Sequence, residues 1–235
     1  MRDVTVRERL VAGAIGAAEA GRVPDSLIRW GTRRLVGHRL SVEQAADPED
    51  REAFWDQAQR GPVALVPDLA NEQHYEVPAT FFDLVLGPRR KYSSAVWPDG
   101  VDTLEEAEDA MLGLTAERAL LADGQRILDL GCGWGAFTLW AADRFPDAEV
   151  VGVSNSHGQR EHILARASEA GLGNVSVITA DINDFSPDGR FDRVVSIEML
   201  EHVRNHPEVF RRMAGWVESD GLAFTHVFAH TEFAY

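Results

Sequence analysis

The sequence feature that most constrains the fold is a glycine-rich loop between an apolar run and a helical segment. The loop spans residues 129–135, reads Asp-Leu-Gly-Cys-Gly-Trp-Gly, and directly follows the apolar pair Ile127 and Leu128. A buried strand that runs into closely spaced glycines and then a helix is typical of parallel α/β sheets, which bind ligands at the carboxyl ends of their strands. Because glycine has no Cβ, the backbone there can turn sharply and come close to a ligand.

The spacing of the glycines indicates which ligand the loop binds. Dinucleotide-binding loops separate their second and third glycines by two residues, so that a pyrophosphate can lie on the helix N-terminus. Here Gly131, Gly133 and Gly135 are separated by single residues, and an acid, Asp129, precedes them. A carboxylate repels a pyrophosphate but attracts an ammonium group, and S-adenosylmethionine carries an ammonium and a sulfonium. We therefore expect Asp129, Gly131 and Gly133 to contact S-adenosylmethionine; the alternative is a glycine-rich turn without a ligand.

Two further polar groups follow the next predicted strands. Ser154, Asn155 and Gln159 follow the second strand, where many nucleoside-binding folds place an acid for the ribose hydroxyls. Hydroxyl and carboxamide groups can bind the same diol. After the third strand, Asp181 could accept a hydrogen bond from the adenine amine while Ile182 packs on the ring. The alternative for Asp181 is a turn cap.

From Thr103 onward the sequence alternates between short apolar runs and helical segments. The predicted strands span residues 126–130, 149–153, 175–179, 192–197 and 222–228. The predicted helices span residues 103–121, 135–145, 157–170 and 207–217. Such alternation forms a parallel sheet with right-handed crossovers. We therefore expect an α/β fold, a Rossmann-like sheet of the class I methyltransferase type with helices on both faces, in which the chain stops after the fifth strand.

The part of the chain before this sheet is mainly helical. Helical spacing of apolar residues predicts helices over residues 4–20, 24–36 and 48–59, and short strands or loops over 40–42 and 63–66. Residues 71–94 mix aromatic and polar groups without a period, which is typical of a segment that lies over another element. We therefore expect a helical N-terminal region (1–70), a cofactor-covering segment (71–102) and a S-adenosylmethionine-binding domain (103–235) that is incomplete at its C-terminus.

Titratable residues gather directly after the fourth predicted strand. A helical turn starting at Glu198 would bring it close to Glu201 and His202, at the same sheet edge as the glycine loop. Neighbouring carboxylates raise the pKa of an imidazole, and such a group can take a proton from an amine. The alternative is that the acids only complement a helix dipole. His226, on the fifth strand, belongs to the same edge and is a further catalytic candidate, although a single histidine there is more often structural.

The composition restricts the partners. The chain has 235 residues, and its 23 Lys and Arg against 38 Asp and Glu give a formal net charge of −15. Such a surface repels nucleic acids, which are therefore not expected as partners. The single cysteine, Cys132, excludes an intrachain disulfide, argues against a zinc site and favours a reducing, cytoplasmic location. Residues 10–18 form an apolar run that is too short to span a membrane, so no integral membrane association is expected.

Several of these motifs together resemble the cyclopropane-fatty-acid-synthase superfamily. The matching stretches are Lys91-Tyr92-Ser93-Ser94, the glycine loop, residues 196–202 and residues 71–86. The resemblance covers the chain from about residue 70 to its end. Lipid-modifying members usually have a small residue at the position of Glu198 and a cysteine at that of Ser94. The branch similar to coclaurine-type N-methyltransferases has Glu-Met-x-Glu-His, as here, and a tail like residues 230–235.

The resemblance implies roles for individual residues. The residues that it places against the cofactor are Tyr92, Ser93, Gly131, Asn155, Gln159, Asp181 and Ile182. In the N-methyltransferase branch, Glu198, Glu201 and His202 would serve the substrate amine. In the lipid branch, Glu201 and His226 match positions that help to hold a bicarbonate base.

We therefore predict transfer of a methyl group from S-adenosylmethionine to the nitrogen of a small-molecule amine. One alternative is cyclopropanation or methylation of an unsaturated fatty-acyl phospholipid chain. A second is a truncated cofactor-binding or partner subunit without turnover, because superfamily members continue well beyond the position of Tyr235. The fifth strand would then leave an exposed sheet edge, through which we expect a homo-oligomer to form.

Overall fold

The computed structural model describes residues 6–65, 79–92 and 94–233. Contacts divide the chain into two compact units. One comprises the residues up to Phe54 together with those from Thr231 onward, and the other comprises Trp55–His230. The second unit carries the sheet and the residues considered below. The three-part division at residues 70 and 102 stays a prediction.

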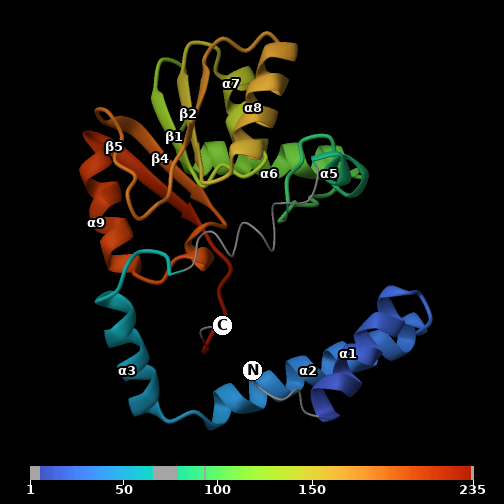
Figure 1. Cartoon of the computed structure of the whole chain (residues 1–235). Coiled ribbons are helices and arrows are strands. Elements are labelled where there is room, and N and C mark those ends of the chain that lie inside the picture. The colour runs from blue at the N-terminus through green and yellow to red at the C-terminus, as the bar shows by residue number, and fades with distance from the viewer. Residues whose placement is uncertain (1–5, 66–78, 93, 234–235) are drawn as a thin grey trace. The chain divides into compact units, whose positions relative to one another are not determined.

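The second unit is built on a sheet of five parallel strands (Figure 1). The strands are β1 (Arg126–Leu130), β2 (Glu149–Ser154), β3 (Val175–Thr179), β4 (Phe191–Ile197) and β5 (Val217–His226). Their order is β3-β2-β1-β4-β5, so the chain moves outward from β1 to one edge and then returns to the other. This order confirms the predicted Rossmann-like fold, and it places the reversal point between β1 and β4, where such sheets bind ligands.

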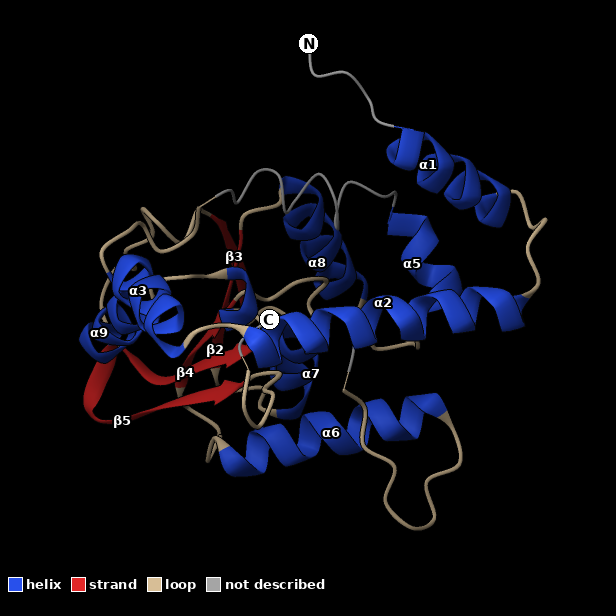
Figure 2. Ribbon diagram, turned by 90° about the horizontal axis from the view of Figure 1, so that it is seen from below, coloured by secondary structure: helices blue, strands red, loops and turns tan. Residues whose placement is uncertain are grey.

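Helices cover both faces of the sheet (Figure 2). On one face lie α6 (Leu104–Arg118), α7 (Ala136–Arg144) and α8 (His157–Glu169); on the other lies α9 (His206–Trp216). Leu128 and Leu130 of β1 pack into the α9 core, whereas Ile127 packs into the α6–α7 core. Successive side chains of a strand point to opposite faces, so this buried strand is apolar on both. Asp129 is the exception, and it faces α7.

Local signals begin and end these helices. Thr103 caps α6 in a capping box with Glu106, which confirms the helix start predicted at Thr103. Ser156 caps α8 by accepting a hydrogen bond from the Gln159 N–H, 3.3 Å away. This cap places Gln159 in the first turn of α8, at the carboxyl end of β2.

The predicted fifth strand is displaced from the observed one. β5 begins at Val217 rather than at residue 222 and ends at His226 rather than at 228. Its first residues include Glu218 and Asp220, whose polarity conceals the strand in the sequence. The register between β4 and β5 is also irregular near Phe191. The first residues of β5 therefore do not follow a simple alternation of inward and outward side chains.

The N-terminal helices are α1 (Val6–Glu19), α2 (Asp25–Ala45) and α3 (Pro48–Gln59). The expectation of a short strand or loop over residues 40–42 is wrong, because α2 continues through them. Among the described residues, every strand belongs to the sheet of the other unit, and a helix satisfies the backbone groups of residues 40–42 locally. Within residues 71–94, the described part contains the short helix α5 (Ala79–Val85), which the aperiodic sequence did not predict.

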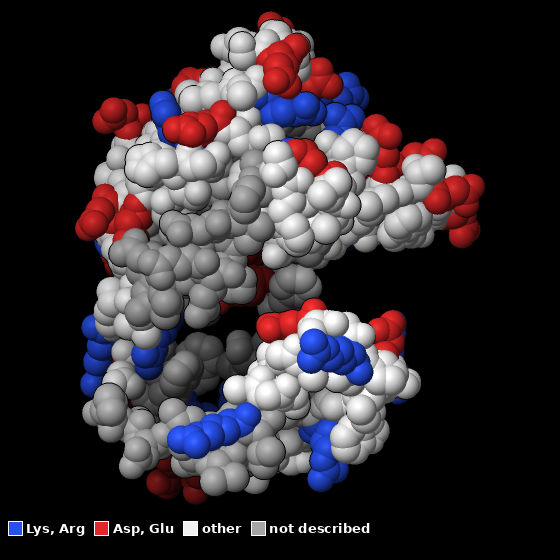
Figure 3. Space-filling view, turned by 45° about the vertical axis from the view of Figure 1, so that its right-hand side comes forward, with Lys and Arg blue, Asp and Glu red and all other residues white. Residues whose placement is uncertain are grey.

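The acidic side chains do not form one patch. On the face drawn in Figure 3 they occur in several separate places. None of the described helices combines the length and the apolar character that a membrane crossing requires.

Candidate functional site

Two cavities adjoin the carboxyl ends of the central strands. The first has a volume of about 330 Å³ and lies against β2 and the residues after β3. The second has a volume of about 480 Å³ and lies against α7 and residues 90–92. The residues that line both are Gly131, Gly133, Glu198, Glu201 and His202. The glycine loop and the acidic turn therefore form a shared wall between two cavities of ligand size.

The glycine loop needs its three glycines for two different reasons. Gly131, Gly133 and Gly135 have φ values of 87°, 52° and 85°, a left-handed region that other residues rarely adopt. A Cβ on Gly131 would lie 2.5 Å from Met199, and one on Gly135 would lie 2.6 Å from Ile163. A Cβ on Gly133 would meet no described atom within 4 Å. Gly131 and Gly135 thus permit close packing, whereas Gly133 borders open space in both cavities.

Asp129 is a buried carboxylate beneath the second cavity. It is 2% exposed, and its Oδ2 accepts a hydrogen bond from Thr138 Oγ1 at 2.6 Å. Burial raises the pKa of Asp129 to about 6, against the lowering effects of the Thr138 hydrogen bonds and the charge of Lys91. Sequence reasoning did not single out Thr138, although its place in the first turn of α7, facing β1, is a usable signal.

Ser154 and Gln159 form a polar pair in the first cavity. Ser154 Oγ donates to Gln159 Oε1 at 2.6 Å and accepts from the Ser156 N–H at 3.0 Å. Gln159 is 3% exposed, and its Nε2 has no hydrogen-bond partner among the described residues. A buried donor without a partner costs about 1–3 kcal/mol. The amide therefore fits a ligand that supplies an acceptor. Asn155, which is exposed, lines the same cavity.

The residues after β3 also line the first cavity. Asp181 Oδ1 accepts a hydrogen bond from the Asn183 N–H at 2.8 Å, so its carboxylate closes a turn while bordering the cavity. The Ile182 carbonyl accepts from Arg212 Nη1 at 2.9 Å, which fixes the backbone there. A loop segment contributes Ala64 and Leu65, and the Ala64 N–H donates to Asn183 Oδ1 at 3.0 Å. Sequence reasoning missed this segment, because nothing local marks it as part of a site.

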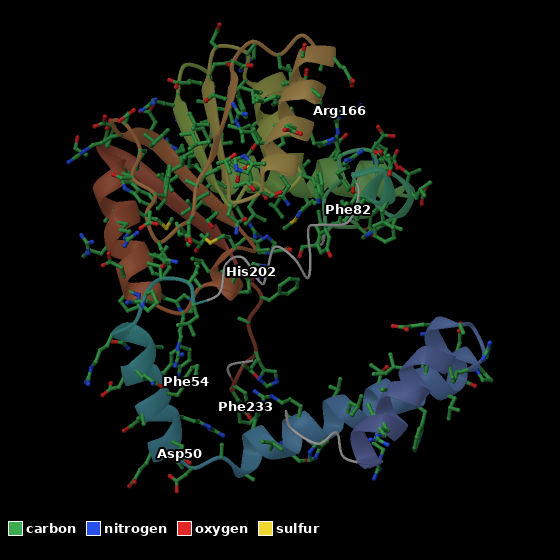
Figure 4. All side chains as sticks on the ribbon, viewed as in Figure 1. Asp50, Phe54, Phe82, Arg166, His202 and Phe233 are labelled. Carbon is green, nitrogen blue, oxygen red and sulfur yellow. The ribbon has the colours of Figure 1, made fainter. Side chains whose placement is uncertain are left out.

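The turn after β4 differs from the predicted one. A helical turn starting at Glu198 is wrong: Glu198 has φ 52°, and the short 3₁₀ helix η1 begins only at Leu200 and ends at His202. The reason is that the Glu198 N–H donates to the His226 carbonyl at 2.8 Å, which continues the β4–β5 pairing by one residue. Glu198, Glu201 and His202 nevertheless converge at the strand ends, where Figure 4 shows His202.

Glu201 has a structural contact in addition to lining both cavities, whereas His226 lines neither cavity. Glu201 Oε1 accepts a hydrogen bond from the Phe228 N–H at 2.5 Å, so it also holds the chain after β5. His226 is not among the residues lining either cavity. It is partly buried, and its Nδ1 is buried without a hydrogen-bond partner in the described part of the chain.

The segment before α6 forms the outer wall of the second cavity. Tyr92 and Lys91 line it, and the Tyr92 ring lies 6.0 Å from that of Phe82. Desolvation lowers the pKa of Lys91, and the nearby carboxylates, first Glu198, oppose this effect. Ser93 lies outside the described residues. Ser94 Oγ donates a hydrogen bond to Glu198 Oε1. Sequence reasoning noted Lys91 as part of a motif and Ser94 as a position that distinguishes the two branches of the superfamily.

The comparisons with known proteins agree with this geometry. Residues 67–233 match the family model described as mycolic acid cyclopropane synthetase. The chain belongs to the mycolic acid cyclopropane synthetase family. A relative of this family, (S)-coclaurine N-methyltransferase of Thalictrum flavum subsp. glaucum, is 33% identical over 238 residues, which cover 100% of the chain and 66% of the relative. The same enzyme of Papaver somniferum is 39% identical over 161 residues, 68% of the chain and 46% of the relative.

The similarity to this family extends to the three-dimensional fold of a solved structure. The crystal structure of coclaurine N-methyltransferase bound to N-methylheliamine and SAH superposes with a TM-score of 0.89 at 33% identity, covering 96% of the chain and 66% of that protein. The chain thus spans slightly less than two thirds of the length of these relatives in the mycolic acid cyclopropane synthetase family.

Proposed function

We propose that the protein binds S-adenosylmethionine and transfers its methyl group to the nitrogen of a small-molecule amine. The observation that carries this proposal is the meeting of two cavities at the glycine loop, with Glu198, Glu201 and His202 in the wall of both. The relatives support it, because they are named N-methyltransferases and one was crystallised with SAH.

The residues of both cavities fit S-adenosylmethionine. In the first, the unpaired Gln159 amide together with Ser154 and Asn155 would hold the ribose hydroxyls. In the second, the buried Asp129 would hold the ammonium group. Gly133 lines both cavities, and a Cβ there would enter open space. Tyr92, Ser93, Gly131, Asp181 and Ile182 complete the proposed cofactor-binding set.

The acidic turn would serve the amine. Bound S-adenosylmethionine supplies an electrophilic methyl group on its sulfonium. A protonated amine has no lone pair, so Glu201 and His202 would hold the amine and remove its proton. Glu198 would orient the nitrogen, and correct orientation is the larger part of catalysis in a displacement reaction. Trp134 and Phe137 line the second cavity, where their rings suit a cationic nitrogen. His226 stays a predicted catalytic residue without a contact to either cavity.

The test is product detection by mass spectrometry. The chain is incubated with S-adenosylmethionine, a panel of primary and secondary aryl-alkyl amines including tetrahydroisoquinoline, and a phospholipid extract. We expect a mass increase of one methyl group on amines alone. Methylation of none of the amines, together with a modified acyl chain, would overturn the proposal.

The lipid reaction is the second candidate, because the matching family model carries the description mycolic acid cyclopropane synthetase. It predicts a new methylene or methyl group on an unsaturated phospholipid in the same assay. The third candidate, cofactor binding without turnover, predicts binding of S-adenosylhomocysteine in a calorimeter and no product of either class.

Two further properties belong to the proposal. Among the described residues, β5 pairs only with β4, and Leu222 and Phe228 at this edge are 42% and 54% exposed. An unpaired strand of this kind accepts a strand from another chain, so we propose self-association through β5, to be measured by light scattering. The cytoplasmic location predicted from the single cysteine stays a prediction.

A further inference from the structure

Two residues with unusual backbone geometry contact each other, and one of them, Glu198, lines the second cavity. Ser94 and Glu198 have φ values of 61° and 52°, and neither is glycine. The Ser94 hydroxyl donates a hydrogen bond to the Glu198 carboxylate across 104 positions of sequence. Non-glycine residues in the left-handed region persist where the surrounding structure holds them, and they gather at functional sites. The pair therefore merits a functional explanation.

Each partner is fixed from its own side. The Glu198 N–H donates to the His226 carbonyl at 2.8 Å, which ties the Glu198 backbone to β5. The segment that carries Ser94 is tied to α6 on both sides. Before Ser94, the Arg89 N–H donates to Glu108 Oε2 at 3.0 Å. After it, the Val96 N–H donates to the Ala107 carbonyl at 3.3 Å.

The anchor on α6 is a buried carboxylate. Glu108 is 1% exposed, and a Cβ on Gly87 would lie 2.4 Å from it, so the segment approaches α6 as closely as a glycine permits. The hydroxyl of Ser94 thus reaches Glu198 from a segment that is held to α6. A glutamate side chain has three rotatable bonds, and this contact restricts their freedom.

We propose that Ser94 is a positioning residue that holds the Glu198 carboxylate toward the amine of the substrate. This inference rests on the proposed function. A carboxylate has about four acceptor sites, so Glu198 can accept from the Ser94 hydroxyl and from an N–H of the amine at the same time. The hydroxyl is the essential group, because a thiol of similar size is a weak donor.

The variants separate the hydrogen bond from the shape of the segment. Ser94→Cys keeps a side chain of similar size with a weak donor. Ser94→Gly removes the hydroxyl and also the left-handed strain, so it keeps the segment in place. Glu198→Ala removes the carboxylate, and Ser94→Ala combined with Glu198→Ala completes a double-mutant cycle. Ser168→Ala, an exposed serine on α8, is the matched control.

Kinetics and calorimetry then test the proposal. For tetrahydroisoquinoline we expect kcat/KM to fall about tenfold in Ser94→Ala, Ser94→Cys and Ser94→Gly, as for loss of a hydrogen bond to a charged group. The double variant should lie within about twofold of Glu198→Ala alone, because either change removes the same contact. Affinity for S-adenosylhomocysteine should stay within about twofold of the parent in every variant.

The results separate this inference from the proposed function. Three outcomes would overturn the role of Ser94 while methyl transfer by the parent stands. They are additive losses of kcat/KM in the double variant, parental kcat/KM in Ser94→Cys, and parental kcat/KM in Ser94→Gly. A second measurement, independent of turnover, determines the affinity of the chain for tetrahydroisoquinoline when it is saturated with S-adenosylhomocysteine. The losses of affinity in the single and double variants should be non-additive in the same way as the losses of kcat/KM. A parent that neither binds nor methylates the amine would overturn both proposals.

Discussion

The turns after β1 and β4 both contain residues at positive φ, but the first uses glycines and the second uses a glutamate. The turn after β1 places Gly131 and Gly133 at positive φ, where glycine has no steric penalty. The turn after β4 places Glu198 at positive φ, which costs about 1–3 kcal/mol for a residue with a side chain. The first turn leaves room for a ligand to approach the backbone, whereas the second keeps a carboxylate at the cavity wall.

The difference indicates what each turn contributes. Replacing a glycine in the β1 turn should remove space, and its effect should appear in cofactor binding. Replacing an acid in the β4 turn should remove a charge, and its effect should appear in turnover.

The largest expected effect concerns Asp129, which begins the β1 turn. Its folded pKa of about 6 lies above its ordinary value of 3.8, so the folded state binds the proton more tightly than the unfolded state. Its contribution to the free energy of unfolding therefore falls as pH rises from 3.8 through 6, by about 3 kcal/mol as an order of magnitude. Asp129→Asn should be more stable than the parent at pH above 7 and equal to it below 4, in urea unfolding without cofactor.

The same substitution separates stability from binding. The carboxamide oxygen of Asn can still accept from Thr138, so the fold should persist. Affinity for S-adenosylhomocysteine should rise through pH 6 in the parent, as Asp129 ionises, and show no such rise in the variant. If calorimetry shows the same pH dependence of this affinity in the parent and in Asp129→Asn, Asp129 does not contact the ammonium group.

The next effect concerns Gly133. Gly133→Val places a β-branched side chain at φ 52° and into open space at the wall of both cavities. We expect affinity for S-adenosylhomocysteine to fall at least about a hundredfold, equivalent to roughly 2.7 kcal/mol. Gly173→Val is the control, because Gly173 is exposed and also has no described atom within 4 Å of its Cβ position. A folded Gly133→Val chain with undiminished affinity contradicts the assignment of the loop.

The same contrast explains what could be predicted from the sequence. The buried strands and the glycine loop were predictable, since apolar runs and glycine spacing act through neighbouring residues. The Ser94–Glu198 contact was not, because it joins segments 104 positions apart. Nor was the geometry of Glu198, because the His226 carbonyl that displaces the helical turn lies on another strand. Local patterns thus identify which residues reach the edge but not how they are oriented there.

A smaller effect is expected in the β4 turn. Glu201→Gln and His202→Ala should each lower turnover at least about tenfold, or roughly 1.4 kcal/mol. Affinity for S-adenosylhomocysteine should change little, in contrast to Gly133→Val. The loss should be partly relieved at high pH, because the amine is then already neutral and needs no base. Steady-state kinetics with one amine across a pH range measure the turnover of both variants. If both turn over at the rate of the parent, Glu201 and His202 have a structural role alone.

The smallest expected effect isolates the strain at Glu198. Glu198→Gly removes the side chain from a left-handed position, so the free energy of unfolding should rise by about 1 kcal/mol while turnover falls. Leu120→Gly is the matched control. Leu120 has φ 52°, is 59% exposed and follows α6, away from both cavities. Glycine is favoured just after a helix, so this control should gain similar stability with parental turnover. Urea unfolding and a methylation assay on both variants give the answer. A loss of stability in Glu198→Gly alongside a gain in Leu120→Gly would mean that contacts of the Glu198 side chain outweigh its strain, and that the acidic turn is held by the same carboxylate that it presents to the cavity.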